Sequence, residues 1–329
     1  MKTGLGILAA LVLTGLTLTY ALWDVDFANL WQTLISGELW VLAPFLLILA
    51  VFYATNAVRW SLMLRPFGRY SVSQLAPSMM IGFAANYVLP FRVGEFVRAF
   101  LLATQINRSK SGVLMTLVLE RFLDLSAILI LYIVALQSLS DAPPGFRASG
   151  WLASLALLGM LTVMALFLYF PETVHRLWRT ISGVLPAALV ERGTIYLQEF
   201  EKGLSSLRAP RVALMLAAES LLRWLLAALL VWLALGAYGP APSLPLCMVV
   251  VGVTAVAVSI PSAPGFIGPM QAAFVLALTP FGIGQEIALS ASILFLLGHF
   301  LPIVAVGGWY FVTRHLSFTQ LRREIEAAE

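Results

Sequence analysis

The chain has 329 residues, of which 60% are hydrophobic and only 11% are charged, and its mean hydropathy is +0.93. Soluble globular domains carry about 25% charged residues, so this composition excludes an ordinary soluble protein and predicts one embedded in a lipid bilayer. The formal net charge of +4 could suggest a nucleic acid partner, but the basic residues stand between apolar runs, where they act as topology signals. We therefore expect no nucleic acid partner.

Six apolar stretches are long enough to cross a hydrocarbon core of about 30 Å as helices that rise 1.5 Å per residue. They lie at about 5–22, 39–62, 112–139, 151–170, 212–238 and 285–313. The first stretch could be mistaken for a signal peptide, but it is long for one, and no small-residue cleavage site precedes Asp24. We interpret it as a retained span.

Two further apolar regions, 73–104 and 244–280, are interrupted by Pro90 and by the cluster Pro261, Pro264 and Gly265. Each arm of these regions is short for a full crossing. Broken backbone at membrane depth is tolerated only where protein or a water-filled cavity covers it. Two re-entrant helical hairpins are the interpretation we favour, and two ordinary spans in each region are the alternative.

The distribution of lysine and arginine predicts the orientation. The segments 23–38 and 239–244 contain neither residue, and 140–150 contains one, whereas six basic residues lie across 171–211. The other basic clusters fall in the alternate segments, at Arg65, Arg69, Arg108, Lys110, Arg314, Arg322 and Arg323. Because cytoplasmic loops carry the excess of positive charge, we expect a multi-pass protein of the cell (inner) membrane with both termini in the cytoplasm.

A shift of 174 residues brings the sequence onto itself. The span at 39–62 falls on 212–238, the span at 112–139 falls on 285–313, and the two hairpins fall on each other. The matched spans run in opposite directions, which predicts inverted repeats like those of many secondary transporters. We expect a single membrane domain over 1–329, with a first repeat at 39–139, a second at 212–313 and a cytoplasmic amphipathic segment at 171–211.

Apolar residues of that segment recur at three- and four-residue steps, namely Leu189, Leu197, Phe200, Leu204 and Leu207. The pattern predicts a helix on the cytoplasmic membrane surface. A linker helix packed on the bundle is an equal alternative.

The first hairpin holds the most concentrated charge. Arg92, Glu95 and Arg98 recur at helical spacing, and Gly94 opens the second helix, whose free N–H groups favour an anion. Guanidinium groups bind phosphate through two hydrogen bonds, so a lipid-phosphate site is the functional hypothesis. An internal network that only closes the hairpin is the alternative.

A second charged group, Glu120, Arg121 and Asp124, lies about ten residues into the span at 112–139. The two carboxylates share a helix face and would repel each other, so an arginine is required nearby. Arg92 or Arg98 is the expected partner. A structural ion-pair network is favoured over a proton-coupling role for either carboxylate.

The second half offers fewer polar groups. Glu219 and Arg223 are four residues apart and could pair with each other. In the second hairpin the candidates are Pro264, Gly265, Gly268 and Gln271, the only amide there. We interpret His299 as a packing residue. No zinc-ligand spacing, P-loop or nucleophile elbow occurs, so we expect no metal, no cofactor and no enzyme activity, although a lipid transferase is not excluded.

Three motifs resemble those of the flippase-like transmembrane family, which includes the membrane region of lysylphosphatidylglycerol synthases. They are Asn86 with Leu89-Pro90-x-Arg92-x-Gly94-Glu95-x-x-Arg98, then Glu120-Arg121-x-x-Asp124, then Pro264-Gly265-x-x-Gly268. The likeness covers about 39–313. It implies transport of a lipid between leaflets, not its synthesis, because the synthases carry a separate aminoacyltransferase domain. Many relatives have Glu where this chain has Gln271, which weakens any titratable role for the second hairpin.

We therefore expect a lipid translocase for an anionic phospholipid or a polyprenyl-phosphate-linked lipid. The substrate-binding candidates are Arg92, Gly94, Glu95, Arg98, Arg121 and Arg223, and the charge-balancing candidates are Glu120, Asp124 and Glu219. One alternative is a membrane-embedded transferase acting on a lipid-linked substrate, with Glu95 or Asp124 as base. Another is a scaffold for a lipid-modifying enzyme partner, docked through 171–211. The sequence leaves the lipid, the coupling and the oligomeric state open.

Overall fold

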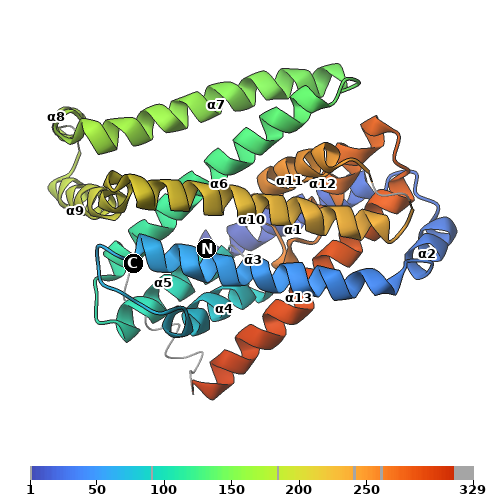
Figure 1. Cartoon of the computed structure of the whole chain (residues 1–329), viewed down its shortest axis with the longest axis horizontal. Coiled ribbons are helices and arrows are strands. Elements are labelled where there is room, and N and C mark those ends of the chain that lie inside the picture. Colours follow the sequence, from blue (N-terminus) through green and yellow to red (C-terminus); the bar gives the residue numbers. More distant parts are fainter. Residues whose placement is uncertain (1, 90–91, 184, 240–241, 260–261, 315–329) are drawn as a thin grey trace.

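Every regular element among the described residues is a helix in this computed structural model of the chain (Figure 1). The structure describes residues 2–89, 92–183, 185–239, 242–259 and 262–314. In chain order the elements are α1 (Lys2–Ala21), α2 (Phe27–Ile35), η1 (Leu39–Val41), α3 (Leu42–Met63), α4 (Val72–Val88), α5 (Gly94–Gln105), α6 (Lys110–Ser138), α7 (Pro144–Tyr169), α8 (Pro171–Ser182), α9 (Ala187–Leu204), η3 (Ser205–Arg208), α10 (Pro210–Gly236), α11 (Leu244–Ser259), η4 (Pro264–Phe266), α12 (Pro269–Leu278), η5 (Thr279–Phe281) and α13 (Gln285–Thr313). The predicted all-α class is confirmed.

Five helical segments of the described chain are long and apolar enough to cross a membrane, so the protein is a multi-pass membrane protein. They are Leu39–Met63, Pro144–Tyr169, Pro210–Gly236, Pro264–Phe281 and Gln285–Thr313. Four of them match predicted spans. The remaining predicted spans, 5–22 and 112–139, are helical as α1 and α6 but fall outside the five. The described apolar part of α1 is only Leu8–Ala21, and α6 carries Glu120, Arg121 and Asp124 close to its middle. The expected number of six full spans is therefore not confirmed.

The segment Pro264–Phe281 is apolar enough to cross a membrane, but it is not one continuous α-helix. Its continuous α-helix, α12, has 10 residues, which cover only about 15 Å at 1.5 Å per residue. Gly265 and Gly268 precede it with φ of +76° and +96°, in a backbone region that glycine adopts without steric cost. The first broken region behaves alike, because α5 has 12 residues and Arg92 precedes it with φ of +54°. Pro90 and Pro261, which were expected to make these breaks, lie outside the described residues.

The two broken regions each pack against a long helix from the other half of the chain. α4 and α5 contact each other, and α4 also packs on α13; α11 and α12 contact each other, and α11 also packs on α6. A glycine permits the close contact in each case. Gly307 of α13 faces the backbone of Met80 on α4, and Gly252 of α11 faces the ring of Tyr132 on α6. α3 and α10 pack side by side at the centre, and α1 packs on α12.

The polar segment 171–211 forms two α-helices, not one. α8 and α9 are seen nearly end-on beside the ends of α7 and α10 in Figure 1, so they lie across the spanning helices. α9 packs on α6 and α7 through Phe200, whose ring is 5.9 Å from that of Phe122 and 4.9 Å from that of Phe167. Leu204 is buried with it, whereas Leu189 is 52% exposed. The segment thus combines both expected properties: one face is packed on the bundle and another leaves apolar residues uncovered.

The contact between α13 and α4 predicts a difference between two adjacent glycines. A Cβ at position 307 would lie 2.6 Å from the carbonyl oxygen of Met80, whereas a Cβ at position 308 would meet nothing within 4 Å. We expect Gly307→Ala to destabilise the protein by about 1–3 kcal/mol through overpacking. Gly308→Ala should leave stability unchanged or raise it slightly, since alanine favours helix. Thermal unfolding of both variants in the same detergent measures this, and equal melting temperatures would contradict the packing.

Candidate functional site

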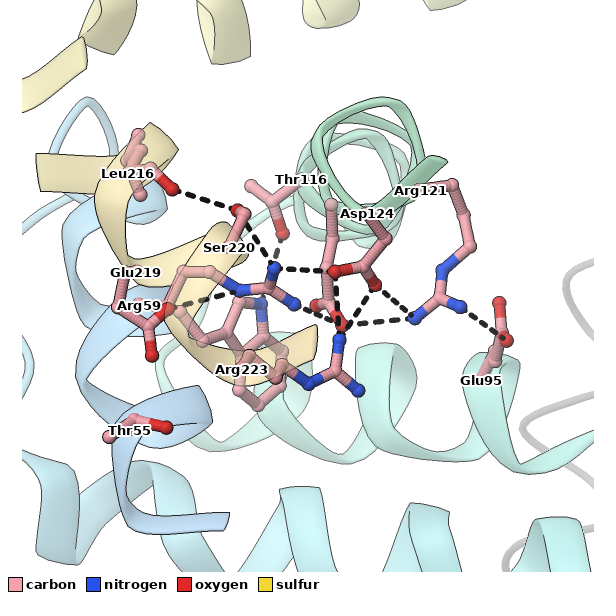
Figure 2. Close-up of polar contacts among 12 residues, drawn as sticks. Thr55, Arg59, Glu95, Thr116, Arg121, Asp124, Leu216, Glu219, Ser220 and Arg223 are labelled. Carbon is pink, nitrogen blue, oxygen red and sulfur yellow. Dashed lines mark hydrogen bonds and ion pairs between the residues drawn. The ribbon is translucent and has the colours of Figure 1, made fainter. Parts of the chain in front are cut away.

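Two carboxylates of α6, Glu120 and Asp124, form the centre of a buried charge network (Figure 2). Glu120 lies 3.3 Å from Arg59, 2.9 Å from Arg98 and 3.0 Å from Arg121. Asp124 lies 2.6 Å from Arg59, 3.3 Å from Arg121 and 2.8 Å from Arg223, and the indole of Trp224 donates a hydrogen bond to it at 3.1 Å. Each carboxylate is thus held by three guanidinium groups.

The geometry explains how two like charges coexist one helical turn apart. A buried carboxylate without partners costs several kcal/mol, and removing one partner of a buried pair typically costs 3–5 kcal/mol. The required positive charge comes from α3, α5, α6 and α10, so the network joins four helices. The expected pairing of Arg98 with Glu120 is present, whereas no carboxylate among the described residues lies within 4.0 Å of the Arg92 guanidinium.

The sequence analysis missed Arg59, which belongs to the centre of this network. Its side chain is fully buried, and its three nitrogens approach Glu120, Asp124 and Glu219. Ser220 of α10 accepts a further hydrogen bond from it at 3.1 Å. The signal was available, because Arg59 lies inside the apolar run 39–62, and an ionised group at membrane depth marks a site by default. It was overlooked because Arg65 and Arg69 follow it as ordinary topology charges.

Arg98 lies apart from Arg92 and Glu95, although the helical spacing of the three residues predicted that they could share one face. Arg98 points into the protein, is 1% exposed and stacks between the rings of Trp60 and Phe83 at 5.3 and 5.2 Å. Arg92 precedes α5 with a left-handed backbone, and its guanidinium lies 5.4 Å from the ring of Phe266. The guanidinium of Arg98 is enclosed by protein and does not line the cavity described below, so a substrate-binding role for it stays a prediction.

Gly94 has a packing position. A Cβ there would collide with the carbonyl oxygen of Gly82, so the residue permits the close approach of α4 and α5. It is buried in this contact. The structure thus gives Gly94 a role in helix contact, and its contribution to an anion site at the start of α5 stays a prediction.

The expected pair between Glu219 and Arg223 does not form. Arg223 turns to Asp124, and its guanidinium also lies 4.7 Å from the ring of Phe52. Glu219 faces Arg59 of α3 instead, with its oxygen 3.8 Å from Nε. Spacing on one helix predicted the pair. Arg223 instead binds Asp124, which is the more deeply buried carboxylate and lies on the neighbouring helix α6.

A cavity of about 190 Å³ adjoins the network between the two halves of the chain. One end of it is polar and is lined by Arg92, Glu95, Arg121 and Arg223. The rest is mainly aromatic and apolar, with Tyr53, Phe83, Tyr87, Trp224, Phe266, Phe295 and His299 among the lining residues. The cavity is therefore amphipathic, and its polar end is mostly positive.

Several polar atoms of the cavity wall have no hydrogen-bond partner within the described chain. They are Asn86 Oδ1, Arg92 Nε, Arg121 Nε, Arg223 Nε and Thr254 Oγ1. Thr254 and Arg223 are 8% and 7% exposed. Because buried polar groups are nearly always hydrogen-bonded, such a concentration in one wall is typical of a site that receives a polar ligand.

The second hairpin contributes several side chains to the cavity wall, namely Val251, Thr254, Ala255 and Val258 of α11, Phe266 of η4 and Met270 of α12. Phe266 lines it and lies 5.4 Å beneath the Arg92 guanidinium. Gln271 instead accepts a hydrogen bond from the Gly268 backbone at 2.8 Å, which caps the start of α12, and Gly268 itself packs on Thr14 and Thr17 of α1. Pro264 and Gly265 form the η4 turn. The described residues contain no group of three or more metal-ligating side chains.

Residues 7–307 match the family described as the lysylphosphatidylglycerol synthase TM region. The chain belongs to this family. The match covers both halves, the charge network and the cavity, so the family membership applies to the whole membrane domain. It gives the chain a membrane lipid-related function and confirms the resemblance inferred from the motifs. A comparison with curated proteins gave no match.

Removal of Arg59 should be strongly destabilising. We expect Arg59→Met, which keeps much of the side-chain volume, to lower the free energy of unfolding by about 3–5 kcal/mol, because Glu120 and Asp124 lose a shared partner. Arg65→Met, an exposed arginine near the end of the same helix, is the matched control and should have little effect. Thermal unfolding in detergent distinguishes them, and an unaltered midpoint for Arg59→Met would contradict the network.

Proposed function

We propose that this protein is a lipid translocase that moves a phosphate-bearing lipid, either an anionic phospholipid or a polyprenyl-phosphate-linked lipid, between leaflets. The amphipathic cavity carries this proposal. Its positive end suits a phosphate group, and its aromatic walls suit the apolar part of a lipid near the headgroup. The acyl or prenyl chains would remain in the bilayer, so that only the headgroup requires a polar path.

Arg92 is the proposed primary contact for the phosphate. It lines the cavity, stacks on Phe266 and has no carboxylate within 4.0 Å among the described residues. Arg121 and Arg223 also line the cavity, but both bind Asp124. The five arginines and four carboxylates of the cluster, with Glu95 and Glu219 included, have formal charges that sum to +1. One anionic ligand would neutralise this excess.

Two inverted halves would provide alternating access to this site. The 174-residue shift takes Arg92 onto Phe266, and both residues have left-handed backbone, with φ of +54° and +59°. They also contact each other, as expected for equivalent residues beside a pseudo-two-fold axis. The same shift exchanges α4 with α11 and α6 with α13, so it converts the observed α4–α13 contact into the observed α11–α6 contact.

The short helices support the proposal that α4–α5 and α11–α12 are re-entrant hairpins. α5 and α12 are each too short to cross about 30 Å, and each begins beside the central cavity. The basic residues around 65–69, 108–110 and 171–211 support an orientation with both termini in the cytoplasm of the cell. α8 and α9 would then lie on the cytoplasmic side.

Translocation should depend on Arg92 more than on any exposed arginine. We expect Arg92→Ala to slow translocation of fluorescent phosphatidylglycerol in proteoliposomes by roughly 10-fold or more, because a hydrogen bond to a charged group is worth about 1.5–3 kcal/mol. Arg92→Lys should retain part of the rate, since the charge remains but the guanidinium geometry is lost. Leaflet exchange is followed by chemical quenching of the outer-leaflet fluorophore.

Arg147→Ala is the matched control for this assay. Arg147 lies outside the cavity and donates to the Ser140 carbonyl oxygen at 2.8 Å, so its loss should leave the rate unchanged. Full activity of a folded Arg92→Ala variant would contradict the site. Turnover of the lipid by purified protein in detergent, where no second leaflet exists, would instead favour a transferase.

A further inference from the structure

Glu219 is the least compensated carboxylate at the centre of the protein. It lies nine residues inside α10, at the flank of the network opposite to Glu95 (Figure 2). Its nearest cation is Arg59 Nε at 3.8 Å, and within the described residues neither of its oxygens makes a hydrogen bond of ordinary geometry, although the Thr55 hydroxyl faces it. Its side chain is 12% exposed. A buried carboxylate ordinarily binds an arginine and holds it in place. Glu219 does this only weakly, because its contact with Arg59 is long.

The other carboxylates of the network differ in this respect. Glu120 and Asp124 are each surrounded by three arginines, so their charge is fully opposed. Glu95 lies beside two cavity arginines, Arg121 at 4.0 Å and Arg92. Glu219 has only Arg59, which it shares with both central carboxylates.

Among the described residues, the charged groups that face Glu219 belong to the same network. They are Arg59 of α3, Asp124 and Glu120 of α6, and Arg223 of α10 itself; the uncharged hydroxyl of Thr55 on α3 also faces it. Arg59 connects Glu219 to Asp124, and Asp124 holds Arg223 at the cavity wall. A charge change at Glu219 therefore alters the electrostatic potential at the ligand site through groups in direct contact.

We propose that Glu219 is a proton-binding site whose occupancy is linked to anion binding in the cavity. This inference rests on the proposed lipid translocation and adds its energy coupling. A proton on Glu219 removes one negative charge, so the formal charge of the cluster rises from +1 to +2 and the cavity attracts a phosphate more strongly. Arg59 then interacts only with the charges of Glu120 and Asp124. Because Asp124 binds Arg59 more strongly in this state, it binds Arg223 less strongly.

Linkage makes this relation reciprocal: an anion in the cavity raises the affinity of Glu219 for a proton by the same factor. A unit charge acting over ~10 Å at an effective dielectric constant of ~20 changes a binding constant by roughly an order of magnitude. Proton and anionic lipid would therefore bind and move together. A proton gradient could drive the lipid without any nucleotide site.

The experiment measures binding of a short-chain phosphatidylglycerol to the purified full-length protein in detergent, at several pH values between about 5 and 8. A phosphodiester probe keeps a constant charge over this range. For the wild type we expect the affinity to fall roughly tenfold as the pH rises. Glu219→Gln, which is permanently neutral, should hold the tight affinity at every pH.

Glu95→Gln is the matched variant, because it removes the other weakly paired carboxylate of the network. It should shift the affinity at every pH but keep the pH dependence. If Glu219→Gln retains the wild-type pH dependence, or if Glu95→Gln abolishes it, the proton site is wrong. Arg92-dependent binding would in that case leave the translocase proposal intact.

A second measurement needs no variant. Addition of the probe to wild-type protein in weakly buffered solution should cause proton uptake, and its absence near the midpoint of the pH dependence overturns the linkage. Binding that is absent, or that is unchanged by Arg92→Ala, would refute the proposed function itself. The two failures are therefore distinguishable.

Discussion

The compensation of Glu120 and Asp124 is the interaction on which the centre of the molecule depends. Two carboxylates one turn apart on α6 are stable at membrane depth only if positive charge surrounds them. Arg59, Arg98 and Arg223 supply it from α3, α5 and α10, so three helices from different parts of the chain converge on one face of α6. The convergence brings the first hairpin, the cavity wall and the contact between α3 and α10 into one place. Without these ion pairs, the buried arginines would cost as much free energy as the buried carboxylates.

Most charges of the network lie in the first proposed repeat, and Arg223 and Glu219 come from the second. The 174-residue shift takes Asp124 onto Gly298 and Phe45 onto Glu219. At the corresponding place in the other half, Phe45 packs closely on Gly298 and stacks edge-on against His299 at 5.4 Å. An apolar contact therefore replaces the ion pairs. Some helix contacts have counterparts in the two proposed halves, whereas the charge is unevenly distributed, so the two sides of the cavity differ in polarity.

The cavity combines an excess of positive charge with aromatic walls. A phosphate at the polar end would satisfy the free guanidinium nitrogens, while the ring faces of Tyr87, Trp224 and Phe266 favour apolar groups and also cations. The left-handed backbone at Arg92 and at Phe266 costs of order 1–3 kcal/mol at each residue and persists only where its surroundings enforce it. Such strain at the meeting point of the two breaks is consistent with a segment that changes conformation during transport.

The sequence by itself determined the membrane class, the helical content, the two interrupted regions, the family and the importance of the residues around Arg92 and Glu120, because hydropathy, glycine and intramembrane charge are local properties of the chain. It did not determine which charges meet. Spacing on one helix predicted a Glu219–Arg223 pair and a common face for Arg92 and Arg98, and it gave Arg59 no partner. Tertiary structure decided these pairings, because the energy of a buried ion depends on every charge around it, and those charges come from helices far apart in the chain.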